Sequence, residues 1–124
     1  MKRDIELIRK LLLYFEEKPD DHMEECPFVE GFSDREIKYH LLLMDEAGLL
    51  RCEREVTKSS GRVIKVYPFS LTWNGHEFLE AARNVTIWNR AKSICLEKSG
   101  SLSFEVIKTL LLNLAKESIG LVTM

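Results

Sequence analysis

Residues 33–50 read SDREIKYHLLLMDEAGLL, and this stretch decides the fold of the chain. Ser33 is a favourable N-cap for a helix, and Glu36, three residues later, completes a capping box. Apolar residues recur at helical spacing, at Ile37, Leu41 and Met44. Gly48 supplies the left-handed residue that commonly ends a helix. The stretch therefore predicts an amphipathic helix that begins after Ser33 and ends at Gly48.

A polar hairpin is expected directly after this helix. Residues 51–56 and 62–69 are the expected strands, with Val63, Val66 or Ile64 alternating in the second, and a turn at residues 57–61 that contains serine and glycine separates them. Such a pattern predicts two antiparallel strands. Residues 71–79 read LTWNGHEFL and predict a further helix, whose N-cap is Thr72 or, as the alternative, Asn74.

A helix, a β-hairpin and a further helix in this order are the pattern of a winged helix. The sequence therefore predicts an α+β winged-helix fold, with residues 33–48 as the recognition-type helix and the hairpin as the wing. Before it, the apolar spacing of residues 1–18 predicts a first helix, which the following proline ends. Acidic residues 20–25 are expected in a loop or one loose helical turn, and residues 28–30 in a short strand.

The chain after the hairpin predicts two helices, and the first of them is the helix that begins in LTWNGHEFL. Apolar residues at helical spacing predict one continuous helix over residues 72–98, and Ser101 or Ser103 is the expected cap of a last helix. We expect a single domain over residues 1–118, followed by a frayed tail at residues 119–124.

The last helix is rich in leucine on more than one side. The leucines that surround it are Leu110, Leu111, Leu112 and Leu114. A helix that is apolar on more than one side usually has two partners. Two interpretations follow: the helix forms a homodimer interface with a second copy of the chain, or it lies deep within one domain.

Composition and spacing argue against several functional classes. The chain of 124 residues has a formal net charge of -2, and no apolar run reaches the length of a membrane span. Its three cysteines lack C-x-x-C spacing, which is typical of reduced thiols in a cytoplasmic protein. No phosphate-binding loop, nucleophile elbow or metal-ligand spacing is present, so we expect no catalytic activity, cofactor or metal. Among the histidines, His40 is expected to pack against the core.

Local charge indicates where DNA would bind. The hairpin is net basic, whereas the helix over residues 33–48 is net acidic. The expected contact residues are Arg35, Lys38 and Tyr39 on that helix, with Lys58 and Arg62 on the hairpin. Side chains of these types bind phosphate oxygens, and arginine and lysine also bind guanine edges. The alternative is that these charges form an ordinary solvated surface.

The sequence leaves two functions open. One is a non-catalytic DNA-binding or transcription-regulatory protein with double-stranded DNA as its partner. The other is a protein–protein interaction module that keeps the scaffold without binding DNA, an alternative that acidic residues 20–25 and the outward-facing Leu42 motivate. The net negative charge argues mildly against DNA, because proteins that bind nucleic acid are usually basic.

Distinctive motifs lie along nearly the whole chain. They are MKRDIELIRKLL at residues 1–12, YHLLLMDEAGL at residues 39–49, LTWNGHEFL at residues 71–79, NVTIWN at residues 84–89 and GSLSFEVIK at residues 100–108. Together they resemble an uncharacterised family of small bacterial and prophage proteins, which implies a phage- or prophage-associated role. The hairpin and Leu-Thr-x-x-Gly are also similar to winged-helix transcriptional regulators of the phenolic-acid-responsive and multidrug-resistance types. Those regulators carry a scaffold helix where this sequence has its acidic segment.

Overall fold

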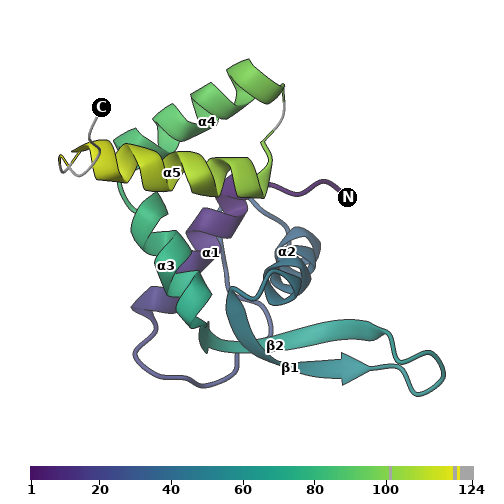
Figure 1. Cartoon of the computed structure of the whole chain (residues 1–124). Coiled ribbons are helices and arrows are strands. Elements are labelled where there is room, and N and C mark those ends of the chain that lie inside the picture. The colour runs from purple at the N-terminus through teal and green to yellow at the C-terminus, as the bar shows by residue number, and fades with distance from the viewer. Residues whose placement is uncertain (101, 119, 121–124) are drawn as a thin grey trace. The chain divides into compact units, whose positions relative to one another are not determined.

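The computed structural model describes residues 1–100, 102–118 and 120. In this part of the chain it contains five helices and a two-stranded antiparallel hairpin (Figure 1). The elements are α1 (Ile5–Glu17), α2 (Asp34–Glu46), β1 (Leu50–Val56), β2 (Val63–Leu71), α3 (Trp73–Ala82), α4 (Val85–Ser99) and α5 (Phe104–Ser118). The predicted α+β class is confirmed. The chain divides into two compact units, Met1–His76 and Glu77–Met124.

The first helix, α1, begins directly after an N-cap aspartate. The Asp4 carboxylate accepts hydrogen bonds from the backbone N–H groups of Glu6 (2.9 Å) and Leu7 (3.3 Å). The buried face of the helix comprises Ile5, Leu7, Ile8, Leu11, Leu12 and Phe15. The helix ends shortly before Pro19, as predicted. Its predicted start is too early, because residues 1–3 precede the cap and are exposed.

The segment between α1 and α2, residues 18–33, contains no helix or strand. The predicted acidic loop is therefore confirmed, and the predicted strand at residues 28–30 is wrong. Phe28 is 78% exposed, so burial does not stabilise an extended pairing there. The segment meets the hairpin through the N–H of Glu24, which donates to the carbonyl of Pro68 in β2 at 3.0 Å.

Both halves of the predicted capping box are present at the start of α2. The Ser33 hydroxyl accepts from the N–H of Glu36 at 3.2 Å, and the Glu36 carboxylate accepts from the N–H of Ser33 at 3.0 Å. The buried residues of the helix are Ile37, His40, Leu41 and Met44. The predicted end is also confirmed. Gly48 has a φ of 72°, and the N–H of Leu49 donates back to the carbonyl of Met44 at 2.9 Å.

The predicted hairpin is confirmed as the antiparallel pair β1 and β2, in which Leu50 faces Leu71 and Arg54 faces Val66. The buried ends of both strands and Val66 join the core of the first unit, where β2 packs against α1 and α2. Gly61 in the connecting turn has a φ of 70°, which glycine adopts without strain. The far end of the hairpin is exposed.

The unit Glu77–Met124 contains most of α3 together with α4 and α5. The predicted single helix over residues 72–98 is wrong, because the chain breaks between α3 and α4. At the break Asn84 has an extended backbone (φ −72°, ψ 116°), and its side chain caps α4 by accepting from the N–H of Ile87 at 3.0 Å. Asparagine favours such a cap over a helix interior. Three helices, rather than the predicted two, follow the hairpin in the described residues.

An aromatic cluster lies in the core of this second unit. Phe78 of α3 stacks on Phe104 of α5, with 4.7 Å between ring centroids, and meets Trp88 of α4 edge-on at 6.4 Å. Trp88 is 1% exposed, so its expected burial is confirmed. Such aromatic pairs stabilise a core beyond the area that they bury.

The connection between α4 and α5 is capped on both sides. Gly100 ends α4 with a φ of 72°, and its N–H donates to the carbonyl of Leu96 at 2.9 Å. Ser103 directly precedes α5, and its carbonyl accepts the first helical hydrogen bond from Ile107 at 2.9 Å. The other expected cap, Ser101, and the predicted frayed tail apart from Gly120 lie outside the described residues.

Candidate nucleic-acid interface

The predicted contact residues of the helix lie within the first two turns of α2. Arg35, Lys38 and Tyr39 are three and four residues apart, a spacing that places them on one face. Arg35 is exposed, whereas Lys38 and Tyr39 are half-buried. The ring of Tyr39 lies edge-on to that of His40, with 5.7 Å between centroids. The structure therefore brings these three side chains together on one polar face.

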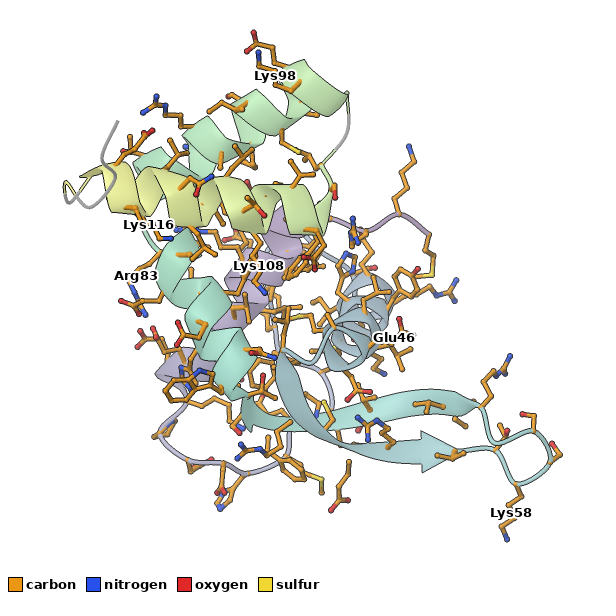
Figure 2. The ribbon with its side chains drawn as sticks, viewed as in Figure 1. Glu46, Lys58, Arg83, Lys98, Lys108 and Lys116 are labelled. Carbon is orange, nitrogen blue, oxygen red and sulfur yellow. The ribbon has the colours of Figure 1, made fainter. Side chains whose placement is uncertain are left out.

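The other two predicted residues lie at the turn of the hairpin, where Lys58 projects from the tip (Figure 2). The hydroxyls of Thr57 and Ser60 bond to each other at 2.5 Å, and both accept from the N–H of Arg62, at 3.2 and 3.3 Å. Neither Lys58 nor Arg62 forms an ion pair with another described residue. The turn therefore presents two uncompensated positive charges on an ordered backbone.

A bidentate ion pair joins the hairpin to the end of α2. Arg54 of β1 donates from Nε and Nη2 to the two carboxylate oxygens of Asp45, at 2.8 and 2.7 Å. The Asp45 side chain is 7% exposed and the Arg54 side chain 51%. The hydrogen bonds and the negative charge of Asp45 raise the pKa of Arg54. Arg54 is thus charged, but its charge is compensated within the protein.

A second ion pair compensates Lys65 of β2. Its ammonium group bonds the carboxylate of Glu25 in the acidic segment, which raises the pKa of Lys65 and lowers the pKa of Glu25. The positive charge of Lys38 also lowers the pKa of Glu25, so this predicted contact residue is itself partly compensated. No local sequence signal marks the Lys65–Glu25 pair, since the two residues are 40 positions apart.

Arg51 is a basic residue of the hairpin that the predicted contact set omitted. It is exposed at the start of β1 and forms no ion pair with another described residue. With Lys58 and Arg62 it makes up the uncompensated cations of the hairpin, which also carries the exposed carboxylates of Glu53 and Glu55. The hairpin is therefore weakly basic, with its positive charge at the tip and at the base.

The leucines proposed for a homodimer interface differ in exposure. Leu111 and Leu114 are buried, Leu110 is half-buried, and Leu112 is 43% exposed. On the same helix Val106 is 41% exposed. The apolar surface that α5 offers to a second copy is therefore limited to Leu112 and Val106 among these residues.

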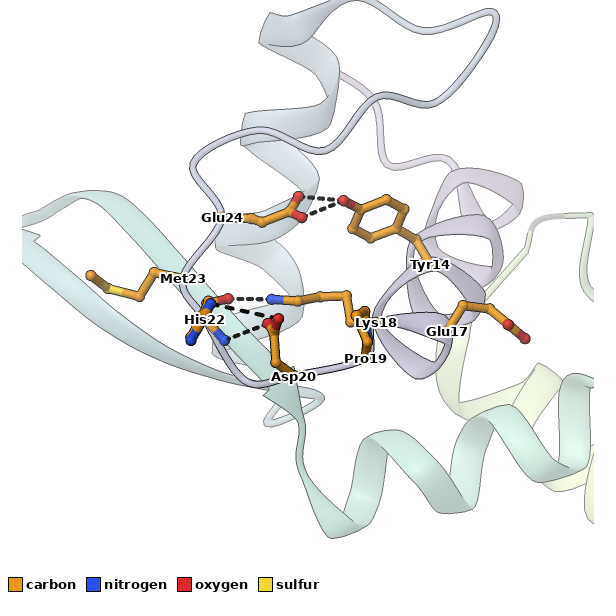
Figure 3. A pocket seen from close by; sticks show the side chains of 8 residues that line it. All are labelled: Tyr14, Glu17, Lys18, Pro19, Asp20, His22, Met23 and Glu24. Atoms are coloured by element: carbon orange, nitrogen blue, oxygen red, sulfur yellow. Dashed lines mark hydrogen bonds and ion pairs between the residues drawn. The ribbon is translucent and has the colours of Figure 1, made fainter.

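Two adjoining clefts lie along α1, outside the predicted sites. The first, of about 480 Å³, is lined by Tyr14, Glu17, Lys18, Pro19, Asp20, His22, Met23 and Glu24 (Figure 3). The second, of about 430 Å³, is lined by Lys10, Leu13, Tyr14, Glu17, Phe28, Val29 and Glu30. The hydroxyl of Tyr14, which lines both clefts, donates to the carboxylate of Glu24 at 2.5 Å. Desolvation by burial, followed by this bond and the charge of Glu24, raises the pKa of Tyr14 to about 12.

Both ring nitrogens of His40 are used inside the fold. Its Nε2 accepts from the N–H of Asp4 at 2.7 Å, so the proton lies on Nδ1, which donates to the carbonyl of Glu36 at 2.7 Å. This neutral histidine joins α2 to the start of α1, which confirms its expected packing role. Among the described residues no cluster of three His, Cys, Asp or Glu side chains has the arrangement of a metal site. No described helix has the length and apolar character that crossing a membrane requires.

Comparison with known proteins identifies the family. Residues 2–101 match a family whose description is hypothetical protein (DUF2513). A protein of Haemophilus influenzae, described as an uncharacterized protein, is 36% identical over 109 residues, which cover 87% of this chain and 90% of that protein. No solved structure gives a significant match. The resemblance to an uncharacterised family is thus confirmed, and the chain belongs to the DUF2513 family.

Proposed function

We propose that this protein is a non-catalytic DNA-binding regulator of the bacterial cytoplasm, phage- or prophage-associated, with a winged-helix architecture in the unit Met1–His76. The observation that carries the proposal is the pair of uncompensated cations, Lys58 and Arg62, at the ordered tip of the hairpin. They lie on the element that pairs through Arg54 with the end of α2. A helix beside a basic hairpin is the arrangement that winged-helix proteins use on duplex DNA.

Each candidate residue has a distinct chemical role in this proposal. Lys58 and Arg62 bind phosphate oxygens, and Arg35 binds a phosphate or the edge of a guanine. The Tyr39 hydroxyl donates to a phosphate, and Lys38 adds charge beside it. Because each neutralised phosphate contributes about 0.9 to the slope of log affinity against log salt, this small set predicts weak and strongly salt-dependent binding.

A homodimer would double this contact set. Two copies joined through the exposed side of α5, which includes Leu112, would present two hairpins to one duplex. Light scattering at high protein concentration tests this arrangement. A molecular mass that stays at the monomer value at every concentration would leave each protein with a single set of contacts.

The test of DNA binding is a salt titration with a fluorescent duplex of mixed sequence. Lys58→Glu together with Arg62→Glu should abolish most of the affinity and flatten the salt slope by about two, because two phosphate contacts are lost. The matched control is Lys98→Glu with Lys116→Glu, which changes the net charge equally at exposed positions on α4 and α5 (Figure 2). The control should bind as the unmodified protein does.

Two results would contradict the proposal. One is absence of binding at low salt, and the other is an equal loss of affinity in the hairpin variant and in the control. Absence of binding at low salt is the result expected of the alternative function, an interaction module that keeps the scaffold without contacting DNA.

A further inference from the structure

We infer that the two adjoining clefts along α1 form a docking surface for a basic, partly apolar segment of another protein. This surface, called the α1 surface below, comprises the outward side of α1 around Tyr14 and the segment over residues 18–30. It lies on elements other than α2 and the hairpin, and it meets β2 through the bonds of Glu24 and Lys18 and the ion pair of Glu25 with Lys65.

Exposed apolar side chains are the first reason. Phe28 is 78% exposed and Met23 is 50% exposed, and each lines one of the clefts. Half-buried Leu13 and Val29 continue the apolar lining beside Phe28. Large exposed apolar side chains that gather around a cleft are typical of interaction sites, whereas single ones are ordinary.

Charge is the second reason, and it selects the partner. Glu17 and Glu30 line the clefts, are exposed, and form no ion pair with another described residue. The two lysines of the surface contact other groups and not these carboxylates. Lys18 donates to the carbonyl of His22 (Figure 3). It also donates to the carbonyl of Phe69 at 3.2 Å.

The second lysine, Lys10, has its ammonium group 5.5 Å from the centroid of the Phe32 ring, where the face of the ring attracts it. Neither lysine forms an ion pair with Glu17 or Glu30, whose negative charges are therefore uncompensated within the described residues. A partner segment that carries at least two Lys or Arg residues beside an aromatic or aliphatic side chain complements both features.

The third reason is that the surface is formed in advance. The Tyr14–Glu24 hydrogen bond fixes the segment to α1, and the N–H of Glu24 fixes it to the carbonyl of Pro68 in β2. Lys18 adds its bond to Phe69 in the same strand. A segment without regular structure that is held at several points loses little conformational entropy when a partner binds.

A library of displayed random peptides of about twelve residues tests this inference without assuming a sequence. Selection on the whole protein should enrich peptides that combine Lys or Arg with an apolar residue. Two variants are tested by fluorescence anisotropy: one carries Phe28→Ser, and the other carries Glu17→Lys together with Glu30→Lys. Enriched peptides should bind each variant about tenfold more weakly than they bind the unmodified protein. All three positions are exposed, and circular dichroism verifies that the variants fold.

Matched controls separate a local effect from a general one. Val85→Ser removes an apolar side chain that is 56% exposed on α4, and Glu97→Lys with Glu105→Lys makes the same charge change on α4 and α5. Both controls should bind the peptides as the unmodified protein does. Enrichment of acidic or purely polar peptides, failure to enrich any peptide, or equal binding to variants and controls would overturn the inference.

A second copy of the chain is the competing occupant. Amide chemical shifts of α1 that change on dilution of the protein alone would assign the surface to self-association and overturn the inference. Shifts that are independent of protein concentration, and that move only when an enriched peptide is added, support it.

Discussion

The backbone of Gly75 in α3 packs directly against the carbonyl oxygen of Leu49, so that a β-carbon on residue 75 would overlap that oxygen. The same carbonyl accepts from the N–H of Thr72 at 3.0 Å. The Thr72 hydroxyl donates to the carbonyl of Gly48 and accepts from the N–H of Gly75 at 3.0 Å. The end of α2 and the start of α3 are therefore joined backbone to backbone, through residues that the helix-ending Ala-Gly-Leu and the Leu-Thr-x-x-Gly motif supply.

Gly75→Ala should destabilise the protein by about 1–3 kcal/mol, because the added carbon forces the two backbones apart and strains the hydrogen bonds of Thr72. Chemical denaturation followed by circular dichroism measures the change. Asn74→Ala is the matched control, since its side chain is exposed in the same turn. Equal effects of the two substitutions would contradict the close approach, because helix propensity alone favours alanine at both positions.

What the sequence could predict depended on whether the signal was local. The Ser33–Glu36 capping box and the end of α2 at Gly48 follow from spacing over a few residues, and both are present. Thr72 was also a local prediction, and its hydroxyl does accept from the N–H of Gly75. The requirement for glycine at residue 75 has no local signal, because it comes from the close approach of the Leu49 carbonyl.

The wrong predictions have different origins. The apolar spacing around Asn84 suits one long helix, and it outweighed a local signal, the asparagine that caps α4 through the N–H of Ile87. A short strand at residues 28–30 needed a buried partner, and Phe28 has none because it is exposed. For the candidate interface, residue types located the cations but could not reveal that Asp45 compensates Arg54 or that Glu25 compensates Lys65.

His40→Ala should cost about 1–3 kcal/mol of unfolding free energy. It removes the Nε2 atom that accepts from the N–H of Asp4 and leaves a cavity in place of a ring that is 2% exposed. The variant also loses the hydrogen bond that joins α2 to the cap of α1. Thermal and chemical denaturation measure the loss, and His76→Ala, at an exposed position, should be nearly neutral. A stability of His40→Ala equal to that of the control would contradict the structural role of this bond.

Tyr14 should ionise near pH 12, about two units above an ordinary tyrosine, as measured by the ultraviolet absorbance of tyrosinate. Because the pKa is raised in the folded state, the resulting stability is present below pH 10 and is lost as the pH rises from about 10 through 12. Glu24→Gln should lower the pKa of Tyr14, since it removes the charge that repels the phenolate, but burial should keep it above 10. Glu17→Gln, on the same helix, is the control and should leave the titration unchanged.

The cysteines should react with iodoacetamide in a fixed order. Burial, with the negative charge of Asp45, raises the pKa of Cys52 to about 12, and Cys95 is fully buried. Burial also raises the pKa of the Cys26 thiol. Because the thiolate is the nucleophile, mass spectrometry of the native protein at mildly alkaline pH should find Cys26 labelled first. Labelling of Cys52 ahead of Cys26 would contradict the desolvation of the Cys52 thiol, and all three should react alike in denaturant.

Asp45→Asn tests whether the compensated arginine of the hairpin can be recruited to DNA. The substitution leaves Arg54 beside an uncharged side chain, so one more cation becomes available next to α2 and the hairpin. The salt slope of duplex binding should steepen by about 0.9, the value for one additional phosphate contact, and affinity at low salt should rise. Stability should fall only slightly, because the pair is half-exposed on its arginine side. Asp21→Asn makes the same change of net charge in the acidic segment, at an exposed position. If both substitutions steepen the slope equally, net charge alone is responsible; if only Asp45→Asn does so, the duplex contacts the hairpin beside Arg54, as the proposed interface requires.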